Sequence, residues 1–167
     1  MRVLAYDKYP AKDTDIEYTT LERLLCEADI VSLHCPLSDD TYHLIDSERI
    51  AMMKKGAYIV NTSRGALIDS EALLEGIKSR HIGGACLDVY EEESDIFFED
   101  RSGHIFDDEV LARLIFMPNV LITSHQAFLT EDALDAIAMT TVKNIMNFHQ
   151  NGFCDNEVKC SKASLTV

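Results

Sequence analysis

Short apolar runs, rich in β-branched residues, recur along the chain and predict its strands. We expect strands at Arg2 to Asp7, Ile30 to His34, Ala57 to Asn61, Gly84 to Val89 and Val120 to Thr123. Within these runs the apolar residues are continuous rather than alternating with polar ones. This pattern favours a parallel sheet whose strands are covered on both faces.

Helical patterns lie between these runs, behind residues that cap helix N-termini. Thr19 and Glu22 have the spacing of a capping box. Asp46 begins a second segment, which we expect to end with a left-handed cap at Gly56. Asp69 caps a third helix.

The longest helical pattern follows Thr130. Its apolar positions recur at helical spacing and comprise Leu134, Ile137, Ala138, Val142, Ile145 and Met146. The complete order is therefore β-α-β-α-β-α-β-loop-β-α. Such alternation implies right-handed crossovers and predicts a doubly wound α/β sheet.

Two segments depart from this alternation. Acidic residues crowd positions 91–109, with Phe97, Phe98 and Phe106 between them. We interpret this stretch as a surface excursion that packs through its aromatic side chains. From Gly152 onward no periodicity is visible, so we expect a loose tail over 152–167.

Composition narrows the class of protein. The 167 residues include 15 basic and 29 acidic ones, a net charge of −14, which argues against nucleic acids and anionic membrane surfaces as partners. The sequence has no apolar run long enough to cross a bilayer and no signal-peptide pattern at its start. Five cysteines without a CxxC pair predict neither a zinc site nor a disulfide framework, and favour the reducing cytoplasm.

Polar residues whose side chains can take part in catalysis or ligand binding follow several predicted strands. In open α/β sheets, ligands bind beyond the carboxyl ends of the strands. Arg64 follows one strand, where a guanidinium can hold a carboxylate through two parallel hydrogen bonds. His125 follows another and could act as a general acid or base. Asp7 ends the first strand, where an acid can bind the hydroxyls of an adenosine ribose.

Each of these residues also has a plainer interpretation. Asp7 and Arg64 would equally suit ordinary turns, and His125 a structural role. A carboxylate could orient His125, but position alone does not choose among the three acids at 91–93. Cys35 lacks any feature that would lower the pKa of its thiol.

Four motifs occur together and in order along the chain. They are His34-Cys35-Pro36-Leu37, the stretch from Asn61 to Asp69, Asp88-Val89-Tyr90-Glu91-Glu92-Glu93, and His125-Gln126-Ala127-Phe128. From Met1 to about Gly152 the chain resembles the D-isomer-specific 2-hydroxyacid dehydrogenases. The insert from Asp95 to Asp100, together with Phe128, resembles the fermentative D-lactate dehydrogenase branch.

The resemblance implies a catalytic triad of Arg64, Glu93 and His125. Glu93 stands 29 residues after Arg64, a spacing that matches the family. Arg64 would clamp the carboxylate of a 2-keto acid such as pyruvate, and reduced nicotinamide would deliver hydride to its carbonyl carbon. His125, kept protonated by Glu93, would protonate the carbonyl oxygen. Ser124 replaces the proline or glycine common before this histidine, a change expected to have little consequence.

The same resemblance implies an NAD site on a Rossmann-like sheet. Asp7 would bind the adenosine ribose and favour NAD over NADP, because its charge would repel a 2′-phosphate. The other implied contacts are Cys35 and Pro36 in the adenine pocket, Thr62, Ser63 and Asp88 beside the nicotinamide, and Phe128 on the substrate side.

A complete member of this family is about twice as long. The resemblance therefore implies a partial NAD-binding domain over 1–126, a helix over 127–151 that returns to a substrate domain, and the tail. The first sheet strand and its G-x-G-x-x-G turn are expected to lie before Asp7, because none of the seven glycines supplies that motif.

Three functions stay open at this point. The leading one is the carboxyl-terminal half of an NAD-dependent D-lactate dehydrogenase, inactive by itself and a homodimer when full length. The second is a dehydrogenase of the same family for a bulkier 2-hydroxy acid. The third is a non-catalytic remnant or NAD-binding module.

Overall fold

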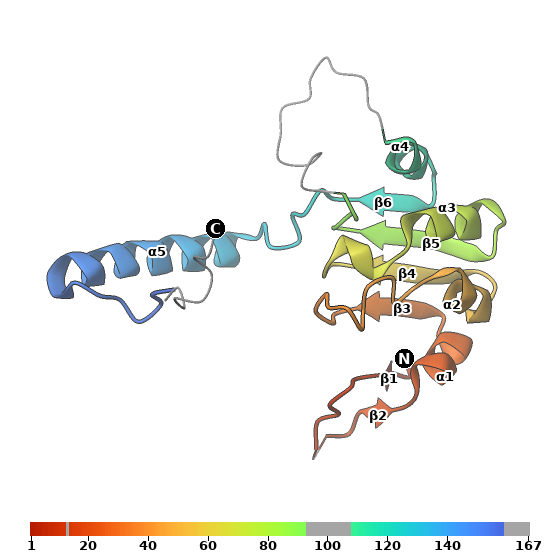
Figure 1. The fold of residues 1–167 in the computed structure, drawn as a ribbon, viewed down its shortest axis with the longest axis horizontal. Helices are drawn as coiled ribbons and strands as arrows, with labels where there is room; N and C mark the ends of the chain where they lie inside the picture. Colours follow the sequence, from red (N-terminus) through yellow and green to blue (C-terminus); the bar gives the residue numbers. More distant parts are fainter. Residues whose placement is uncertain (13, 93–107, 159–167) are drawn as a thin grey trace, which may run out of the picture. The chain divides into compact units, whose positions relative to one another are not determined.

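The computed structural model describes residues 1–12, 14–92 and 108–158. The chain divides into two compact units, Met1–Ala127 and Phe128–Val167. The described part of the first unit holds the strands and four α-helices, and that of the second holds one α-helix (Figure 1). The division falls one residue from the predicted boundary after residue 126.

Four parallel strands form the main sheet of the first unit. They are β3 (Ile30–Leu33), β4 (Ala57–Asn61), β5 (Ile82–Leu87) and β6 (Val120–Ile122), and they lie side by side in this order (Figure 1). The predicted parallel α/β architecture is confirmed. The bounds of β4 are as predicted, whereas β5 starts and ends two residues before the prediction.

A second, two-stranded parallel sheet pairs β1 (Leu4–Ala5) with β2 (Glu17–Tyr18). The sequence pattern did not reveal β2, and β1 is shorter than the predicted strand from Arg2 to Asp7. Among the described residues, β1 pairs only with β2 and β3 pairs only with β4. Each of these two strands therefore keeps one edge without a described partner.

Helices α1 (Leu21–Glu27), α2 (Ser47–Met52) and α3 (Ser70–Lys78) connect the strands. The predicted caps of α2 and α3 are confirmed: the Asp46 and Asp69 carboxylates each accept a hydrogen bond from a backbone N–H three residues on.

Two predicted helix ends are wrong. Thr20, rather than Thr19, caps α1 by accepting from the Arg23 N–H, because the Thr19 N–H is bonded to the Ala5 carbonyl and extends the β1–β2 pairing. Helix α2 ends at Met52, before the predicted end at Gly56.

The sequence pattern also missed a helix. Between β5 and β6 it predicted a loop, but residues Glu109–Ile115 form α4. The Asp108 carboxylate caps this helix by accepting from the Leu111 N–H at 2.8 Å. Leu111 and Leu114 are fully buried, so tertiary packing stabilises a helix too short for a clear periodic pattern.

The four helices of the first unit lie in one layer. They contact one another in the sequence α1, α2, α3 and α4, as successive right-handed crossovers in a sheet of order β3-β4-β5-β6 require (Figure 1). On β3, Val31 and Leu33 are buried while Ile30 is 58% exposed. The prediction that strands are covered on both faces is thus wrong for β3, because the described residues supply helices to one face only.

The core lies between this helix layer and the sheet. Its fully buried side chains come from both layers and from the turns that join them, and include Leu25, Ile45, Ile59, Leu67, Leu73, Leu111 and Leu114. This packing fixes the carboxyl ends of the strands relative to one another.

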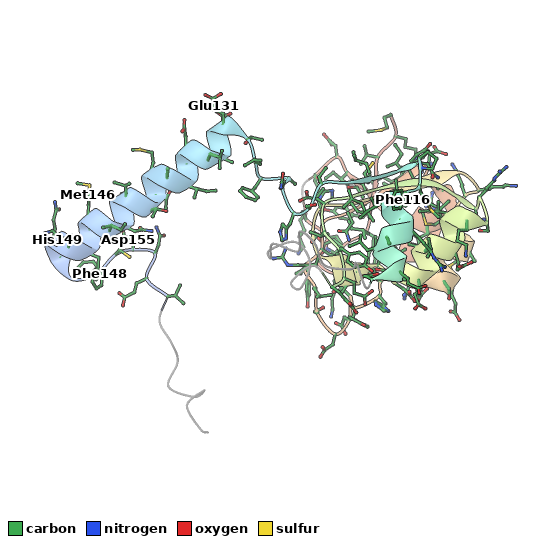
Figure 2. The ribbon with its side chains drawn as sticks, turned by 90° about the horizontal axis from the view of Figure 1, so that it is seen from above. Phe116, Glu131, Met146, Phe148, His149 and Asp155 are labelled. Carbon is green, nitrogen blue, oxygen red and sulfur yellow. The ribbon has the colours of Figure 1, made fainter. Side chains whose placement is uncertain are left out.

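The described part of the second unit is built on α5 (Glu131–Asn151). Its cap at Thr130 is confirmed, and Gly152 ends it in the left-handed conformation at φ 76°. None of its side chains is buried; Met146 and Phe148, labelled in Figure 2, are 54% and 56% exposed. None of the helices in the described part of the chain has both the length and the apolar character that crossing a bilayer requires.

Candidate active site

The predicted site residues of the first unit follow the carboxyl ends of its strands. Asp7 stands two residues after β1, and Cys35 two residues after β3. Arg64 follows β4, Asp88 follows β5 directly, and His125 follows β6. Because parallel strands end at the same edge of a sheet, the last four of these residues lie along one edge of the main sheet.

Asn61 orders the turn that carries Arg64. Its side chain is 1% exposed. The amide Nδ2 donates to the Arg64 carbonyl at 2.9 Å, and Oδ1 accepts from the Ser63 N–H at 3.1 Å. Ser63 Oγ in turn donates to the Cys35 carbonyl at 2.7 Å, which ties the ends of β4 and β3 together. The backbone at Arg64 is therefore held from both sides.

The Arg64 side chain is exposed and makes one short internal contact. Its Nη1 donates to the Ser63 carbonyl at 2.7 Å. Among the described residues the other guanidinium N–H groups have no recorded partner, so the planar fork remains available for a carboxylate.

Asp88 holds the turn that carries His125. Its Oδ1 accepts hydrogen bonds from the Thr123 hydroxyl and the Gln126 N–H, and its Oδ2 accepts from the Ala127 N–H at 2.8 Å. The Asp88 carbonyl also accepts from the His125 N–H. With 4% of its surface exposed, Asp88 is chiefly an anchor for residues 123–127.

These contacts set the charge of the Asp88 carboxyl. Burial by itself would raise its pKa. The hydrogen bonds from Thr123 and from the two backbone amides, together with nearby His125, outweigh burial and leave the pKa of Asp88 below its usual value. Asp88 is therefore an anion at neutral pH, beside His125.

The anchored turn has an unusual backbone. Ser124 and His125 lie at φ 50° and 56°, in the left-handed region that residues with a Cβ rarely adopt. Proline, whose φ is fixed near −65°, could not replace Ser124 in this conformation, whereas glycine could. The expectation that Ser124 has little consequence considered only side-chain chemistry and missed this constraint.

Asp7 and Cys35 follow β1 and β3 and are near enough for the charge of Asp7 to act on the Cys35 thiol. Burial raises the pKa of the Cys35 thiol, and the negative charge of Asp7 raises it further. Asp7 Oδ1 accepts from the Tyr9 N–H at 2.7 Å, which is the contact expected of a turn residue. Lys8 and Asp40, paired at 2.6 Å, join the loops that follow the two strands.

The remaining predicted residues are less closely engaged. Pro36 and Thr62 are exposed at the ends of β3 and β4. Phe128 is 51% exposed and begins the second unit, so it is described apart from the others. Glu93 lies outside the described residues, and Glu92 is exposed. Glu91 is engaged elsewhere, with the His43 imidazole at 2.6 Å.

The sequence patterns singled out Arg64, Asp88 and His125, but they missed Asn61 and Thr123, which help to hold the two turns. In the sequence, Asn61 stands out only as part of a motif, and Thr123 only as the end of a predicted strand. A buried asparagine at a strand end, followed two residues later by serine, is a signal of a side-chain-stabilised turn that could have been used. Thr123 offered no such signal, because its partner Asp88 is distant in sequence.

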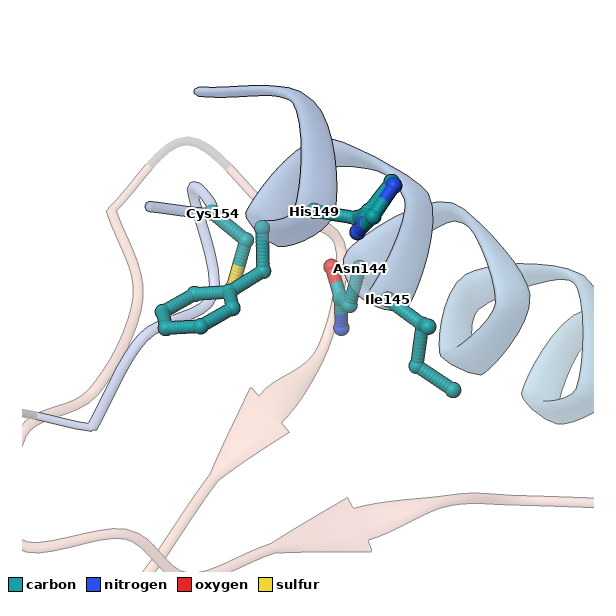
Figure 3. A pocket seen from close by; sticks show the side chains of 5 residues that line it. Asn144, Ile145, His149 and Cys154 are labelled. Atoms are coloured by element: carbon teal, nitrogen blue, oxygen red, sulfur yellow. The ribbon is translucent and has the colours of Figure 1, made fainter. Parts of the chain in front are cut away.

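An open surface pocket of about 450 Å³ in the second unit is a separate feature (Figure 3). Its lining is mainly apolar and contains none of the predicted site residues; the lining residues are Asn144, Ile145, Phe148, His149 and Cys154. In the part of the chain that is described, no group of three or more histidine, cysteine or acidic side chains could hold a metal ion.

Residues 1–127 match the family described as D-isomer specific 2-hydroxyacid dehydrogenase, NAD binding domain. The chain belongs to this family. It is 48% identical over 161 residues to a D-lactate dehydrogenase of Escherichia coli, covering 95% of this chain and 49% of that protein. An aromatic 2-oxoacid reductase of Clostridium sporogenes is 45% identical over 161 residues, with the same coverage.

The fold agrees with that of solved dehydrogenases of the family. A D-lactate dehydrogenase from Treponema pallidum superimposes with a TM-score of 0.87 at 36% identity, covering 95% of this chain and 49% of that one. The chain thus spans about half the length of the relatives it matches. The matched domain is the one that binds NAD in this family.

The described residues fit the two ends of such a cofactor. At one end, the Asp7 carboxylate would hold the ribose hydroxyls, beside the half-buried Cys35. At the other, Thr62 and Ser63 belong to the turn that carries Arg64, and the Asn61 carbonyl before this turn accepts from the N–H of Asp88, which anchors the turn of His125. The glycine-rich turn that would hold the pyrophosphate is not found in the sequence given.

Proposed function

We propose that this chain supplies the NAD-binding half of a D-lactate dehydrogenase that reduces a 2-keto acid such as pyruvate to the D-2-hydroxy acid. The observation that carries the proposal is the pairing of two anchored turns at one sheet edge. Asn61 fixes the turn of Arg64 and Asp88 fixes the turn of His125, and the Asp88 N–H donates to the Asn61 carbonyl at 2.9 Å.

Each residue has a distinct chemical task in this proposal. Arg64 binds the substrate carboxylate through its fork and stabilises charge that develops on the carbonyl oxygen. His125 gives a proton to that oxygen, and Glu93 keeps His125 protonated. NAD, when bound in its reduced form, supplies the hydride. General acid catalysis of this kind contributes about 10²- to 10⁴-fold.

The direct test combines this chain with the amino-terminal half of the Escherichia coli relative. We call this assembly the complemented enzyme, and its activity is followed by pyruvate-dependent oxidation of NADH. We expect the chain alone to be inactive and the complemented enzyme to turn over. Arg64→Lys should weaken both keto-acid binding and turnover, and His125→Ala should mainly reduce turnover. A complemented enzyme without activity would overturn the proposal.

The role of Glu93 has its own test. Reduction needs the protonated imidazole, so Glu93→Gln should move the alkaline limb of the pH–rate profile for reduction to lower pH. Glu92→Gln is the matched control, since it removes an equal charge one residue away and should leave the limb in place. The opposite result would move the assignment to Glu92.

The cofactor preference follows from Asp7. Its negative charge should disfavour the 2′-phosphate of NADP. Comparing the dissociation constants of NADH and NADPH measures this effect directly. In the complemented enzyme, Asp7→Ala should weaken NADH binding and raise the relative use of NADPH. An unchanged preference would leave Asp7 as a turn residue only.

A second substrate class is favoured by one relative. The aromatic 2-oxoacid reductase is nearly as similar to this chain as the D-lactate dehydrogenase is. Comparing kcat/KM for pyruvate and phenylpyruvate in the complemented enzyme does not decide this, because the borrowed half contributes to the pocket. The same comparison with the native amino-terminal half does, and we expect pyruvate to be preferred.

The surroundings of the chain complete the proposal. The edges of β1 and β3 that lack described partners would receive a strand from the amino-terminal half, and α5 would return to the substrate domain. We further propose a homodimer in the cytoplasm, where the four described cysteines would stay free thiols, as they are here. Light scattering on the full-length protein tests the dimer.

A further inference from the structure

The Glu91 carboxylate accepts hydrogen bonds from two other parts of the chain. Its Oε1 accepts from His43 Nε2 at 2.6 Å and from the Tyr42 hydroxyl at 3.3 Å. Its Oε2 accepts from the Ser70 hydroxyl at 3.2 Å. Because a carboxylate can only accept, His43 Nε2 carries the proton whether or not the imidazole is charged. We call Glu91, His43, Tyr42 and Ser70 the Glu91 clasp.

The clasp is more than a surface contact. The side chains of His43 and Glu91 are 28% and 23% exposed, so water only partly screens their interaction. The Tyr42 ring stacks on the His43 ring, with centroids 4.0 Å apart. His43 itself lies at φ 49°, a conformation that costs free energy and that surrounding contacts must hold.

The clasp encloses the turn that follows Arg64. On one side, the His43 N–H donates to the Ala66 carbonyl at 2.8 Å. On the other, Gly65 lies so close to Tyr90 and Glu91 that an added Cβ would stand 2.0 Å from the Tyr90 carbonyl. The backbone between Arg64 and Ser70 is therefore gripped between the loop before α2 and the segment after β5.

We infer that Glu91 is a positioning residue for Arg64. The clasp locks the turn directly after Arg64, while Asn61 locks the turn directly before it. Together they fix the point from which the guanidinium reaches the substrate carboxylate. The inference rests on the proposed function, because it assigns Glu91 to the aim of the substrate-binding arginine and not to proton transfer.

The kinetic test uses Glu91→Ala in the complemented enzyme, with Glu92→Ala as its control. Misplacing Arg64 should lower kcat/KM for pyruvate by about 10- to 100-fold, with a marked rise in KM and no change in NADH affinity. Glu92 makes no comparable contact with any residue that the structure describes, so its replacement should change these constants by less than about twofold. Equal behaviour of the two variants would overturn the inference.

Two further variants separate positioning from general loss of structure. Glu91→Gln can still accept from His43 and exchange a hydrogen bond with Ser70, so it should restore most of the affinity for pyruvate. In an Arg64→Lys background, Glu91→Ala should lower kcat/KM for pyruvate little further, because the guanidinium that Glu91 positions is already gone. Fully additive losses would show that Glu91 acts independently of Arg64. If Glu91→Ala does not fold, His43→Leu removes the same contact.

Amide hydrogen exchange on the chain alone tests the clasp without catalysis. The His43 and Leu67 amides donate to carbonyls of the enclosed turn, and Glu91→Ala should speed their exchange while Glu92→Ala does not. Unchanged exchange would overturn the inference even if the enzyme is active. Conversely, a complemented enzyme that lacks all activity defeats the proposed function, and exchange then decides the clasp by itself.

Discussion

The two units use the same kind of apolar pattern with opposite results. In the first unit, helices of six to nine residues such as α2 and α3 bury their apolar side chains against the sheet. In the second, the 21-residue helix α5 has a regular apolar stripe, yet Ile137 and Ile145 are 52% and 64% exposed. An apolar stripe therefore predicts that a helix has something to bury, but not what will cover it.

The difference also separates two sources of helix stability. Helix α4 has only seven residues and exists because Leu111 and Leu114 are buried in the core. Helix α5 depends on its length, its cap at Thr130 and its left-handed end at Gly152. Short helices are marginal in water without packing. The helices of the first unit are therefore stabilised by tertiary packing, whereas α5 is stabilised by its length and its caps.

The largest effect on stability should come from a mutation that creates a cavity in the core of the first unit. Leu114→Ala removes a fully buried side chain and should lower the free energy of unfolding by about 2–5 kcal/mol in urea titrations. The matched change in the second unit, Ile145→Ala, should alter it by less than about 0.5 kcal/mol. A large loss at Ile145 would mean that α5 is buried in solution and would break the comparison.

Asp88→Asn should rank next, because the amide cannot accept all of the hydrogen bonds that the carboxylate accepts. We expect a loss of about 1.5–3 kcal/mol in the free energy of unfolding at pH 7, with faster exchange of the Gln126 and Ala127 amides. The Ser63 amide, which donates to Asn61 in the other turn, should keep its protection against hydrogen exchange. Equal loosening of both turns would show that they are one cooperative structure.

The pH dependence of the same contact has a definite sign. The pKa of Asp88 is lower in the folded chain than in the unfolded one, so its contribution is complete above the unfolded value of about 3.9. That contribution is lost as pH falls through the folded value. The urea midpoint of the wild-type chain should therefore fall more steeply below about pH 4 than that of Asp88→Asn. Parallel pH curves would contradict this assignment.

Helix α5 should respond to its cap more than to its apolar face. Thr130→Ala removes the hydroxyl that accepts from the Ala133 N–H and should cost about 1 kcal/mol of helix stability. Secondary chemical shifts along residues 131–151 would measure the loss of helix. If Ile137→Ala reduces helicity as much as Thr130→Ala, an apolar partner rather than the cap stabilises α5.

The smallest effect expected is a gain. Ser124→Gly relieves a left-handed backbone and should raise the free energy of unfolding by about 0.5–1 kcal/mol, whereas Ser124→Ala should not. Thermal unfolding of the three chains side by side measures the difference. A loss of stability in Ser124→Gly would indicate that the Ser124 hydroxyl makes a contact of its own.

Local patterns in the sequence determined most elements of this protein. The run from Ala57 to Asn61 became a strand with those bounds, and the caps at Asp46, Asp69 and Thr130 are where the sequence predicted them. These features depend on residues within one or two turns of each other, so adjacent residues are enough to specify them. The ordered motifs similarly identified the family and named Arg64 and His125.

Only the tertiary structure decided what holds those residues. Asp88 anchors residues 123–127 across more than 30 positions, and Glu91 contacts His43 across 48. Helix α4 is stable because Leu111 and Leu114 reach a core built from distant strands. Each of these depends on groups that meet only after the sheet has formed, and hydrogen bonds or burial between such groups leave no periodic signal along the chain.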